Sequence, residues 1–368
     1  MPIEQIDIEN FLRLSNESPI LDVRSPGEFS HAHIPGAVSL PLFTDEQRKI
    51  IGTAYKQQSR QIAVKMGLEY FSERMKLIPE EVEEICKSRQ KAKLNGQLKS
   101  VSILLHCWRG GMRSGAVAWL LNLYGFKVYT LKGGYKAFRK WALAQFENEY
   151  KLNILGGYTG SGKTMLLQEM KKVGNLVIDL EKLANHKGSA FGSLGEEDQP
   201  TQEMFENLFA TELYKAVESG KDIMTNGEHY TKNSSEIWLE DESRHIGRVG
   251  IPNRLWDAMR KSPLYFLDIP FEERLKHVIE IYGRFEKEEL EKSILRIQKR
   301  LGGLETKKAI NFLHENNLHE CFSILLKYYD KFYMHSLYKR ENLESVLNKI
   351  SCATVDLNNA RTFYNQSA

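Results

Sequence analysis

The chain has 368 residues, and its 51 lysine and arginine residues against 48 acidic residues give a formal net charge of +3. Its 42% hydrophobic content supports a sizeable core, while 26 glycines and 10 prolines exclude collagen-like and proline-rich disordered classes. The length predicts two domains at about 150 residues each, and the nearly balanced charge excludes a general polycation but not a local basic surface for nucleic acid.

The N-terminal segment and the cysteines predict a cytoplasmic protein. The segment is acidic and lacks the basic region and apolar run of a signal peptide, and no stretch approaches 18 apolar residues. The four cysteines form no CxxC pair, so neither a disulfide scaffold nor a zinc cluster is expected. They are Cys86, Cys107, Cys321 and Cys352.

Strands and helices alternate in the first part of the chain. Such alternation is typical of a parallel sheet with helices on both faces. A helix at about 135–150 is expected to link this part to the second, which divides the chain into domains 1–145 and 146–368. The expected strands are 20–23, 36–40, 101–105 and 126–131, and the expected helices are 45–95 and 113–124.

The second part again mixes strands with helices. From 272 to about 349, apolar residues at three- and four-residue spacing predict a mostly helical region, broken at Gly302 and Gly303. The fold class is therefore α/β, with a doubly wound N-terminal domain and a second α/β domain that has a helical C-terminal region. The other elements expected here are a helix at 163–172 and strands at 152–156, 176–180, 222–225, 237–239 and 264–268.

The most specific motif is Gly157-Tyr-Thr-Gly-Ser-Gly-Lys-Thr164, a full P-loop match between an expected strand and an expected helix. In this motif, backbone N–H groups and a helix N-terminus surround an anion, and the lysine reaches the terminal phosphate. Thr164 would ligate Mg²⁺ if a nucleotide binds, with an acidic partner either within 240–242 or at Asp179. The predicted di- or triphosphate site consists of Gly157, Gly160, Ser161, Gly162, Lys163 and Thr164.

A second loop, His106-Cys-Trp-Arg-Gly-Gly-Met-Arg-Ser114, lies between the strand at 101–105 and the helix at 113–124. Loop amides, a helix N-terminus and the charges of Arg109 and Arg113 favour a thiolate, and such settings lower a cysteine pKa to about 3.5–7.5. The spacing Cys-x5-Arg encloses a tetrahedral oxyanion and also fits cysteine-dependent phosphatases. The other three cysteines lack such surroundings and are expected to be inert.

The first part resembles the rhodanese homology domain over about 1–141. The resemblance is carried by Leu21-Asp-Val-Arg-Ser-Pro-Gly-Glu-Phe29, His33-Ile-Pro-Gly-Ala37, Leu131-Lys-Gly-Gly134 and Trp141. In that family the loop cysteine carries a transferable sulfur as a persulfide. The loop here is longer than in typical single-domain sulfurtransferases, which favours a phosphate-sized ligand over a lone sulfur atom.

The whole chain resembles the bacterial tRNA 2-selenouridine synthase family, in which a rhodanese-like domain precedes a P-loop domain. The segments that carry this resemblance are GTAYKQ at 52–57, DLEKLANHKGS at 179–189, QPTQ at 199–202, EDESR at 240–244 and RLGG at 300–303. The resemblance implies that selenium replaces the sulfur of 2-thiouridine at the tRNA wobble position. It implies geranylation of the sulfur with geranyl diphosphate first, and then exchange with selenophosphate.

The resemblance also implies roles for the two loops. Cys107 would take the selenium as a selenylsulfide and Arg113 would hold the phosphate, while the P-loop would stabilise the departing diphosphate without hydrolysing a nucleotide. Arg109, Gly110, Gly111 and Met112 would complete the selenophosphate loop. No tightly bound cofactor and no metal-ligand set are expected, beyond Mg²⁺ at the P-loop.

The expected partners are the anticodon arm of a tRNA with 2-thiouridine and an enzyme that supplies selenophosphate, and the chain is expected to be a monomer. Two basic runs are candidates for contacting tRNA phosphates, one at 132–140 without any acidic residue and one at 296–308. Trp108, Tyr135 and Tyr158 would either stack on a flipped base or belong to the core. The basic residues predicted to contact tRNA are Lys136, Arg139, Lys140 and Arg300.

Two other interpretations stay open at the level of sequence. The two loops together would also suit a cysteine-dependent phosphatase fused to a P-loop kinase. A nucleotide-dependent RNA-binding regulator with an inactive rhodanese-like domain is the second alternative, although the intact Cys107 and Arg113 argue against it.

Overall fold

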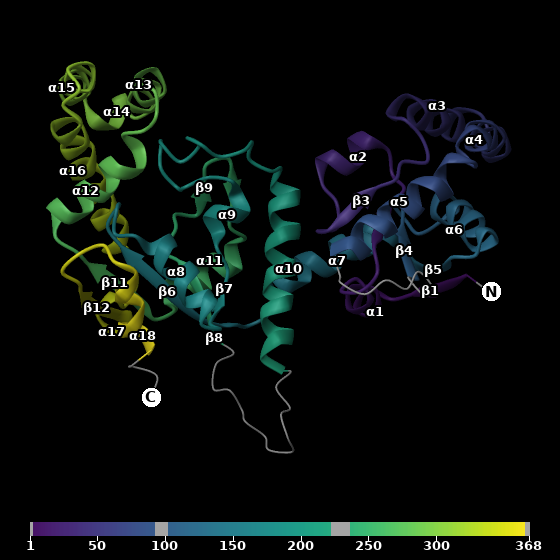
Figure 1. The fold of residues 1–368 in the computed structure, drawn as a ribbon, viewed down its shortest axis with the longest axis horizontal. Helices are drawn as coiled ribbons and strands as arrows, with labels where there is room; N and C mark the ends of the chain where they lie inside the picture. Colours follow the sequence, from purple (N-terminus) through teal and green to yellow (C-terminus); the bar gives the residue numbers. More distant parts are fainter. Residues whose placement is uncertain (1–2, 93–101, 222–235, 365–368) are drawn as a thin grey trace. The chain divides into compact units, whose positions relative to one another are not determined.

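The structure is a computed structural model that describes residues 3–92, 102–221 and 236–364. The chain divides into two compact units, Met1–Ala144 and Gln145–Ala368 (Figure 1). Within the described ranges, no helix has the length and apolar character needed to cross a membrane.

The first unit is built on a five-stranded parallel sheet with the strand order β1-β5-β4-β2-β3. Its central strands are apolar on both sides, as expected for a sheet covered by helices on both faces, and the consecutive residues Ile103, Leu104 and Leu105 of β4 are all fully buried. The four strands predicted for this part are confirmed, although residue 101 lies outside the described part, and the short edge strand β1 is an addition. The strands are β1 (Glu4–Ile6), β2 (Ile20–Asp22), β3 (Ala37–Ser39), β4 (Ser102–His106) and β5 (Lys127–Leu131).

The charged segment predicted as helical at 45–95 forms three helices, of which residues 93–95 lie outside the described part. The hydroxyls of Thr44 and Ser59 accept hydrogen bonds from backbone N–H groups and cap the first two helices, which interrupts the segment. The linker helix predicted at about 135–150 ends at Gln145. The helices are α1 (Ile8–Leu14), α2 (Pro26–His31), α3 (Asp45–Gln57), α4 (Arg60–Arg74), α5 (Leu77–Ala92), α6 (Met112–Tyr124) and α7 (Gly134–Gln145).

The second unit has its own five-stranded parallel sheet, in the order β12-β11-β6-β8-β7. The strand predicted at 176–180 is wrong beyond residue 177, because Asp179 caps a helix that begins at Leu180. The strand predicted at 222–225 lies outside the described residues. The C-terminal region is not only helical, since β12 returns to the sheet beside β11. The strands are β6 (Lys151–Gly157), β7 (Leu176–Val177), β8 (Glu236–Glu240), β11 (Leu264–Asp268) and β12 (Leu347–Ser351), and β9 (His245–Ile246) with β10 (Val249–Gly250) forms a separate pair.

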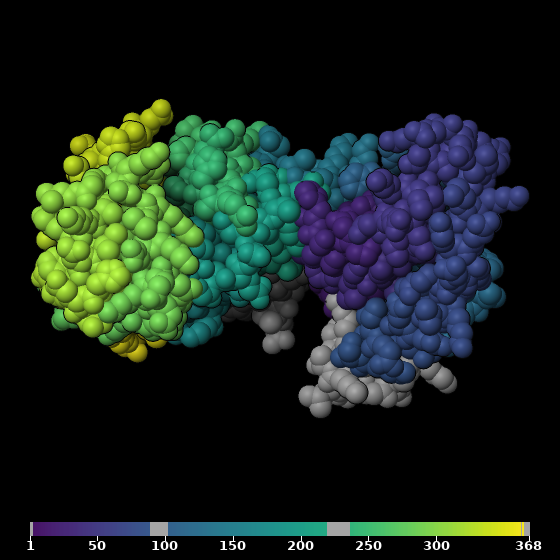
Figure 2. Space-filling view, turned by 90° about the horizontal axis from the view of Figure 1, so that it is seen from above, coloured from purple at the N-terminus to yellow at the C-terminus, as the bar shows by residue number. Residues whose placement is uncertain are grey.

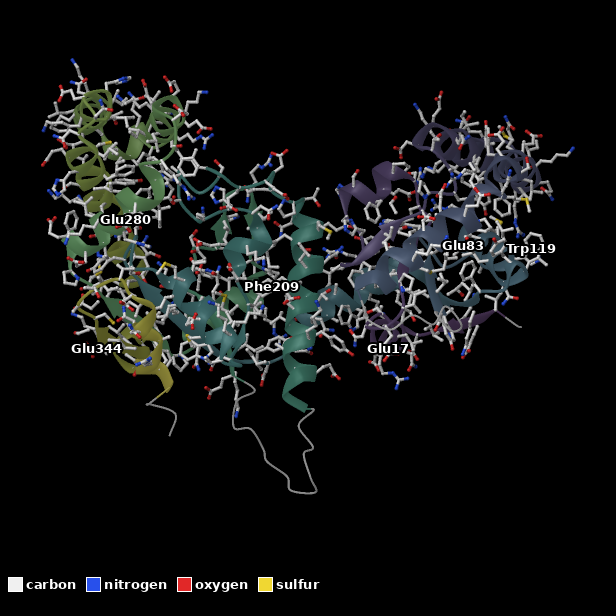
Figure 3. All side chains as sticks on the ribbon, in the orientation of Figure 1. Glu17, Glu83, Trp119, Phe209, Glu280 and Glu344 are labelled. Atoms are coloured by element: carbon white, nitrogen blue, oxygen red, sulfur yellow. The ribbon has the colours of Figure 1, made fainter. Side chains whose placement is uncertain are left out.

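Helix α10 (Gln202–Lys221) is absent from the sequence predictions. Its residues Phe205, Phe209 and Leu213 recur every four positions and are fully buried, and Figure 3 labels Phe209 in the interior of this unit. The helices from α12 to α16 share an apolar cluster that includes Leu275 and Phe322, and they form the yellow-green block in Figure 2. The predicted break after Leu301 is confirmed. The remaining helices are α8 (Lys163–Lys172), α9 (Leu180–Ala184), α11 (Asn253–Lys261), α12 (Phe271–Tyr282), α13 (Lys287–Arg296), α14 (Gln298–Leu301), α15 (Gly303–His314), α16 (Leu318–Leu337), α17 (Leu343–Val346) and α18 (Arg361–Tyr364).

The first turn of α7 holds the loop that follows β4. The backbone N–H groups of Tyr135 and Lys136 donate to the carbonyl oxygens of Cys107 (2.8 Å) and Trp108 (3.0 Å). Gly134 has a φ of +59°, and a Cβ atom there would overlap with the carbonyl oxygen of Cys107. Glycine therefore permits a backbone approach that no other residue allows, and this approach fixes the loop.

We predict that Gly134→Ala destabilises the first unit by about 2 kcal/mol or more, because alanine is strained at positive φ and its methyl group meets backbone atoms. Urea unfolding measures the change. Gly115→Ala is the matched control, since Gly115 lies inside α6 with open space around it and alanine there should stabilise the helix by up to about 1 kcal/mol. Equal stability of the two variants would contradict the prediction.

Candidate active sites at two strand-to-helix loops

Cys107 lies where β4 ends, directly after His106 and ahead of α6. In the register of the sheet, Asp22 at the end of β2 is paired with His106, so the residues that follow these two strands meet at one edge. Cys107 is 3% exposed and belongs to the apolar cluster of this unit. The loop therefore places the sulfur at the carboxyl ends of the central strands, where ligands bind in parallel α/β sheets.

The surroundings of the Cys107 sulfur favour a thiolate. Its Sγ lies 3.2 Å from Oγ of Ser114. Burial alone would raise the pKa of Cys107, but hydrogen bonds from the Ser114 hydroxyl and from the N–H groups of Ser114 and Gly111, together with the charge of Arg113, outweigh burial and lower it. By contrast, burial raises the pKa of Cys321 to about 12. Cys107 is therefore the candidate nucleophile.

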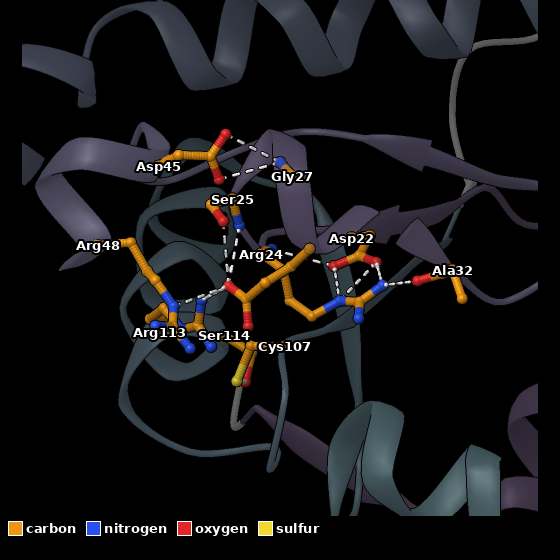
Figure 4. A network of polar contacts seen from close by, with 11 residues as sticks. Asp22, Arg24, Ser25, Gly27, Ala32, Asp45, Arg48, Cys107, Arg113 and Ser114 are labelled. Carbon is orange, nitrogen blue, oxygen red and sulfur yellow. Dashed lines mark hydrogen bonds and ion pairs between the residues drawn. The ribbon is translucent and has the colours of Figure 1, made fainter. Parts of the chain in front are cut away.

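Arg113 is oriented by the carboxylate of Glu28. Its Nη1 donates to Oε2 of Glu28 at 2.8 Å, and Nε of Arg48 lies 3.4 Å from the same oxygen (Figure 4). Burial would raise the pKa of Glu28, but its contacts with Arg113, Ser25 and Arg48 outweigh burial and lower the pKa to about 2. A guanidinium has five N–H donors, so the bond to Glu28 leaves others for an anion held beside Cys107.

A buried ion pair between Arg24 and Asp22 lies next to the Cys107 loop. Arg24 donates to both carboxylate oxygens of Asp22 at 2.6–3.0 Å, and its guanidinium lies 3.9 Å from the ring centroid of Tyr135. Both charged side chains are at most 1% exposed. His106 lies beside them, and burial lowers its pKa to about 4, so it is neutral at pH 7. Because an unpartnered buried charge is costly, this pair fixes the chain after β2 and its contact with Tyr135 of α7.

The P-loop motif at 157–164 connects β6 to α8, as predicted. Nζ of Lys163 donates to the carbonyl oxygen of Gly157 at 3.1 Å, so the lysine lies over the loop. The hydroxyl of Tyr333 accepts a hydrogen bond from the Gly157 N–H at 3.2 Å and donates to Asp241 at 2.7 Å. Helix α16 therefore supports the start of the loop.

Helix α12 supports the middle of the same loop. Arg274 is 3% exposed, forms two hydrogen bonds with the carboxylate of Asp330, and donates to the carbonyl oxygen of Thr159 at 3.1 Å. Its guanidinium also lies 4.6 Å from the ring centroid of Tyr158. Tyr158 therefore packs against Arg274 within the P-loop unit, which favours the core role over stacking on a base.

The P-loop lines a pocket of about 970 Å³. Aromatic and aliphatic side chains from α12 and α16 also line it, among them Ile281, Tyr282, Tyr328 and Phe332. Besides Lys163, the basic residues that line it are Lys187, Arg244, Arg284, Arg296 and Arg300. An anion-binding loop next to apolar surface suits an elongated ligand with a phosphate end and an apolar body.

Three carboxylates gather beside Thr164. Carboxylate oxygens of Glu181, Glu240 and Glu242 lie within 4.8 Å of one another, and the Thr164 hydroxyl donates to Glu181 at 3.1 Å. Glu240 is fully buried, and neither of its carboxylate oxygens has a hydrogen-bond partner. Burial raises the pKa of all three, and repulsion by Glu181 adds to burial at Glu240 and Glu242, whose pKa values lie well above the ordinary value. Oxygen ligands of this kind fit Mg²⁺, which would supply the missing partner.

Of the two acidic candidates for holding Mg²⁺, Asp179 and the segment 240–242, only the second reaches the carboxylate cluster. Asp179 caps α9, accepting a hydrogen bond from the Lys182 N–H at 2.9 Å. Of the segment 240–242, Glu240 and Glu242 reach the cluster, whereas Asp241 is bound to Tyr333 and Arg340.

The residues predicted to contact tRNA fall into two groups. Lys136 and Lys140 are exposed one helical turn apart on α7, next to the Cys107 loop, and Arg139 is half-buried. Arg300 instead lines the P-loop pocket, 5.7 Å from the ring centroid of Phe332. Among the aromatic candidates, Tyr135 is fully buried and belongs to the core, while Trp108 is 39% exposed beside the loop.

Several residues of the two sites have no assigned role in the sequence predictions. Glu28 lies within the segment that resembles rhodanese, and Ser114 directly follows Arg113, so both were within reach of the motifs. The run Tyr328-Tyr-Asp-Lys-Phe-Tyr333 has aromatics at helical spacing, but nothing local indicates that it meets the P-loop. Nothing in the sequence around Arg274 indicates its contact with the P-loop either.

Comparison with known proteins matches both parts of the chain. A family model described as the tRNA 2-selenouridine synthase AAA domain matches residues 150–356, and a rhodanese-like domain model matches residues 7–140. The tRNA 2-selenouridine synthase of Sulfurovum sp. (strain NBC37-1) is 33% identical over 88% of this chain and 89% of its own length. That of Shewanella piezotolerans is 32% identical over 92% of this chain and 94% of its own length.

We predict that Ser114→Ala raises the pKa of Cys107, because the largest stabilising contact of the thiolate is lost. Thiolate is present above the pKa, so alkylation at pH 7 should slow about tenfold, as expected for a lost hydrogen bond to a charged group. The pH dependence of iodoacetamide labelling, read by peptide mass spectrometry, measures this. Ser72→Ala, at an exposed helical serine, is the control. An unchanged labelling profile in Ser114→Ala would contradict the proposed contact.

Proposed function

The chain belongs to the tRNA 2-selenouridine synthase family, and we propose that it exchanges the sulfur of wobble 2-thiouridine for selenium in two steps at two sites. The first step, geranylation of the sulfur, would occur at the P-loop, and the second, selenation, at Cys107. Geranylation would therefore belong to domain 146–368 and selenation to domain 1–145, a division that the two compact units support. The family models match the regions of both loops, which favours this function over the phosphatase–kinase alternative.

The pocket at the P-loop is the observation that carries the geranylation step. In this step the sulfur of 2-thiouridine attacks C1 of geranyl diphosphate, the C–O bond breaks, and diphosphate leaves with the electron pair while the base loses its N3 proton. The loop N–H groups and Lys163 would stabilise the charge that develops on the diphosphate. The wall with Tyr328 and Phe332 would take the geranyl chain.

Selenation would then occur at a carbon that alkylation has activated. Alkylating the sulfur makes C2 of the base more electrophilic and turns the sulfur into a better leaving group. A selenium nucleophile attacks C2, the C–S bond breaks, and geranylthiolate leaves with the electron pair. Arg113 and the loop amides of Arg109, Gly110, Gly111 and Met112 would hold the phosphate of selenophosphate beside Cys107.

The proposed carrier of selenium is a selenylsulfide on Cys107. It forms when the thiolate attacks selenium and the Se–P bond breaks, with phosphorus leaving with the electron pair as phosphite. The selenide end then attacks C2, and an external thiol breaks the S–Se bond, releasing the selenouridine and leaving a mixed disulfide. A second thiol equivalent restores Cys107, so the step consumes two thiols.

Mg²⁺ is the ion we propose for the carboxylate cluster. Glu181, Glu240, Glu242 and the Thr164 hydroxyl would hold it, and its charge would offset that of the diphosphate. The support is geometric, namely the close carboxylate oxygens and the unpartnered Glu240.

For tRNA we propose the exposed face of α7 as the docking surface on the first unit. Lys136 and Lys140 share this face, with Arg139 beside them, and the helix starts at the Cys107 loop. Arg300 would assist at the P-loop pocket. The monomeric state, the cytoplasmic location and the partner that supplies selenophosphate stay predictions.

We predict that Cys107→Ser and Lys163→Ala separate the two steps. Cys107→Ser should abolish selenation and leave geranylation largely intact, because the nucleophile belongs to the second step alone. Lys163→Ala should slow geranylation by about 10²–10³-fold, since a charge-assisted contact to developing charge is lost. Single-turnover assays with 2-thiouridine tRNA, read by nucleoside mass spectrometry, measure both steps. Geranylation by Lys163→Ala within about threefold of wild type would show that the loop serves another ligand.

The phosphorus-containing product of the single-turnover selenation assay tests whether Cys107 carries selenium as a selenylsulfide. The selenylsulfide predicts phosphite and a selenium adduct on Cys107. Inorganic phosphate together with a phosphate adduct on Cys107 would contradict it, because the thiolate would then attack phosphorus and release hydroselenide.

We predict that Glu240→Gln weakens binding of a divalent cation by at least about tenfold, since a buried charged ligand is lost. Mn²⁺ binding followed by electron paramagnetic resonance measures the affinity without requiring turnover. Mg²⁺ should also raise the melting temperature of the wild type but not of the variant, because a ligand stabilises the state that binds it. Glu236→Gln, at the start of the same strand, is the control. Equal Mn²⁺ affinity in Glu240→Gln and wild type would exclude the cluster as a metal site.

A further inference from the structure

The first unit contains a second pocket, of about 590 Å³, whose walls are α3, α4 and the loop after Cys107. Its apolar lining includes Ile51 of α3, Val64 and Leu68 of α4, and Met112 of the loop. The exposed fractions of Val64, Leu68 and Met112 are 37%, 58% and 54%, so these side chains face the pocket opening rather than the core. Clustered exposed apolar side chains of this kind mark a surface that binds an apolar group.

The charges at this pocket are of one sign. Arg48, Lys49, Lys56, Arg109 and Arg113 line it, and no acidic residue does. An apolar cavity with a basic lining suits a ligand that carries an apolar chain on a polyanion. Arg48 and Arg113 already contact Glu28. A neutral lipid would make no use of the charges of Lys49, Lys56 and Arg109, and a bare nucleic acid would leave the apolar surface unused.

The pocket adjoins the loop that carries Cys107. Trp108, Arg109, Met112 and Arg113, which line it, belong to the same loop as Cys107. The group that leaves in selenation is bonded to the carbon that receives the selenium. Wherever C2 of the base meets the Cys107 loop, the chain on its sulfur must therefore lie within a few bonds of that loop.

We propose that this pocket holds the geranyl chain of the S-geranylated wobble base during selenation, with the flanking cations on the tRNA backbone. The proposal rests on the two-step function above and adds to it a second isoprenoid site, distinct from the pocket at the P-loop. The first site would bind geranyl diphosphate, and this one the thioether product. The pocket then selects the geranylated base over 2-thiouridine and keeps water from C2 when the chain is seated.

The test compares two alkylated substrates on three variants. The probes are synthetic anticodon stem–loops that carry S-geranyl-2-thiouridine or S-methyl-2-thiouridine, with selenophosphate as co-substrate. Wild type should selenate the geranyl probe with a kcat/KM at least about tenfold above that of the methyl probe, since apolar groups in a fitted pocket give discrimination of this order. Leu68→Glu should lose this preference, because the geranyl chain would have to desolvate a carboxylate.

Control variants distinguish a specific loss of geranyl binding in the pocket from misfolding of the first unit. Leu68→Met should keep the preference, and so should Leu123→Glu, which changes a 70% exposed leucine of α6 that does not line the pocket. Leu68→Glu should retain geranylation of 2-thiouridine and its rate with the methyl probe, which shows that the first unit is folded.

The outcomes distinguish the pocket from the function. If wild type treats both probes alike, or if Leu68→Glu keeps the preference, the pocket does not hold the chain, while the two-step function stands. If Leu68→Glu loses activity on both probes equally, the residue acts on the loop and the proposal is overturned. If wild type neither geranylates 2-thiouridine nor selenates either probe, the proposed function itself fails.

Discussion

Both candidate sites depend on one constraint of parallel sheets. A central strand that runs directly into a helix leaves backbone N–H groups at the helix N-terminus without intrahelical partners, and they face the ligand at the carboxyl end of the strand. In the first unit β4 runs into α6 through the loop of Cys107, and in the second β6 runs into α8 through the P-loop. The same geometry suits a thiolate in one unit, and in the proposed function it would hold a tetrahedral anion there and a diphosphate in the other unit.

The two loops differ in the charges placed around them. At the first site, Arg113 is paired with an ionised Glu28, and the buried Asp22 is paired with Arg24. Each of these charges therefore has a partner of opposite sign. Around the P-loop the carboxylates of Glu181 and Glu240 are crowded, and Glu240 has no partner. Paired charges suit a site whose nucleophile must stay ionised. Carboxylates that repel one another instead favour the binding of a cation together with its anionic substrate.

The sequence was sufficient where the signal is local. The P-loop, the Cys107 loop and the apolar strands next to them depend on runs of fewer than ten residues, and the structure has these elements as predicted. The residues that complete the sites come from far along the chain: Glu28 is 85 positions from Arg113, and Tyr333 is 176 positions from Gly157. Spacing in sequence does not indicate such pairings, and the partners can be found only once the fold is known.

Length explains most of the differences in secondary structure. Strand β1 has three residues and β7 has two, which is too short for a periodic pattern, and Asp179 ends the apolar run at 176–180 by capping a helix. Strand β12 follows a long helical region and is recognised only through its pairing with β11. Helix α10 has a local helical pattern in Phe205, Phe209 and Leu213, so this element is predictable from the sequence.

In the proposed function, this chain places selenium on the wobble base of tRNA. The most direct measurement is mass spectrometry of wobble nucleosides from cells that have or lack the protein, grown with selenium. Cells that have it should contain 2-selenouridine, and cells that lack it should contain 2-thiouridine in its place. An undiminished level of 2-selenouridine in cells that lack the protein would contradict the account.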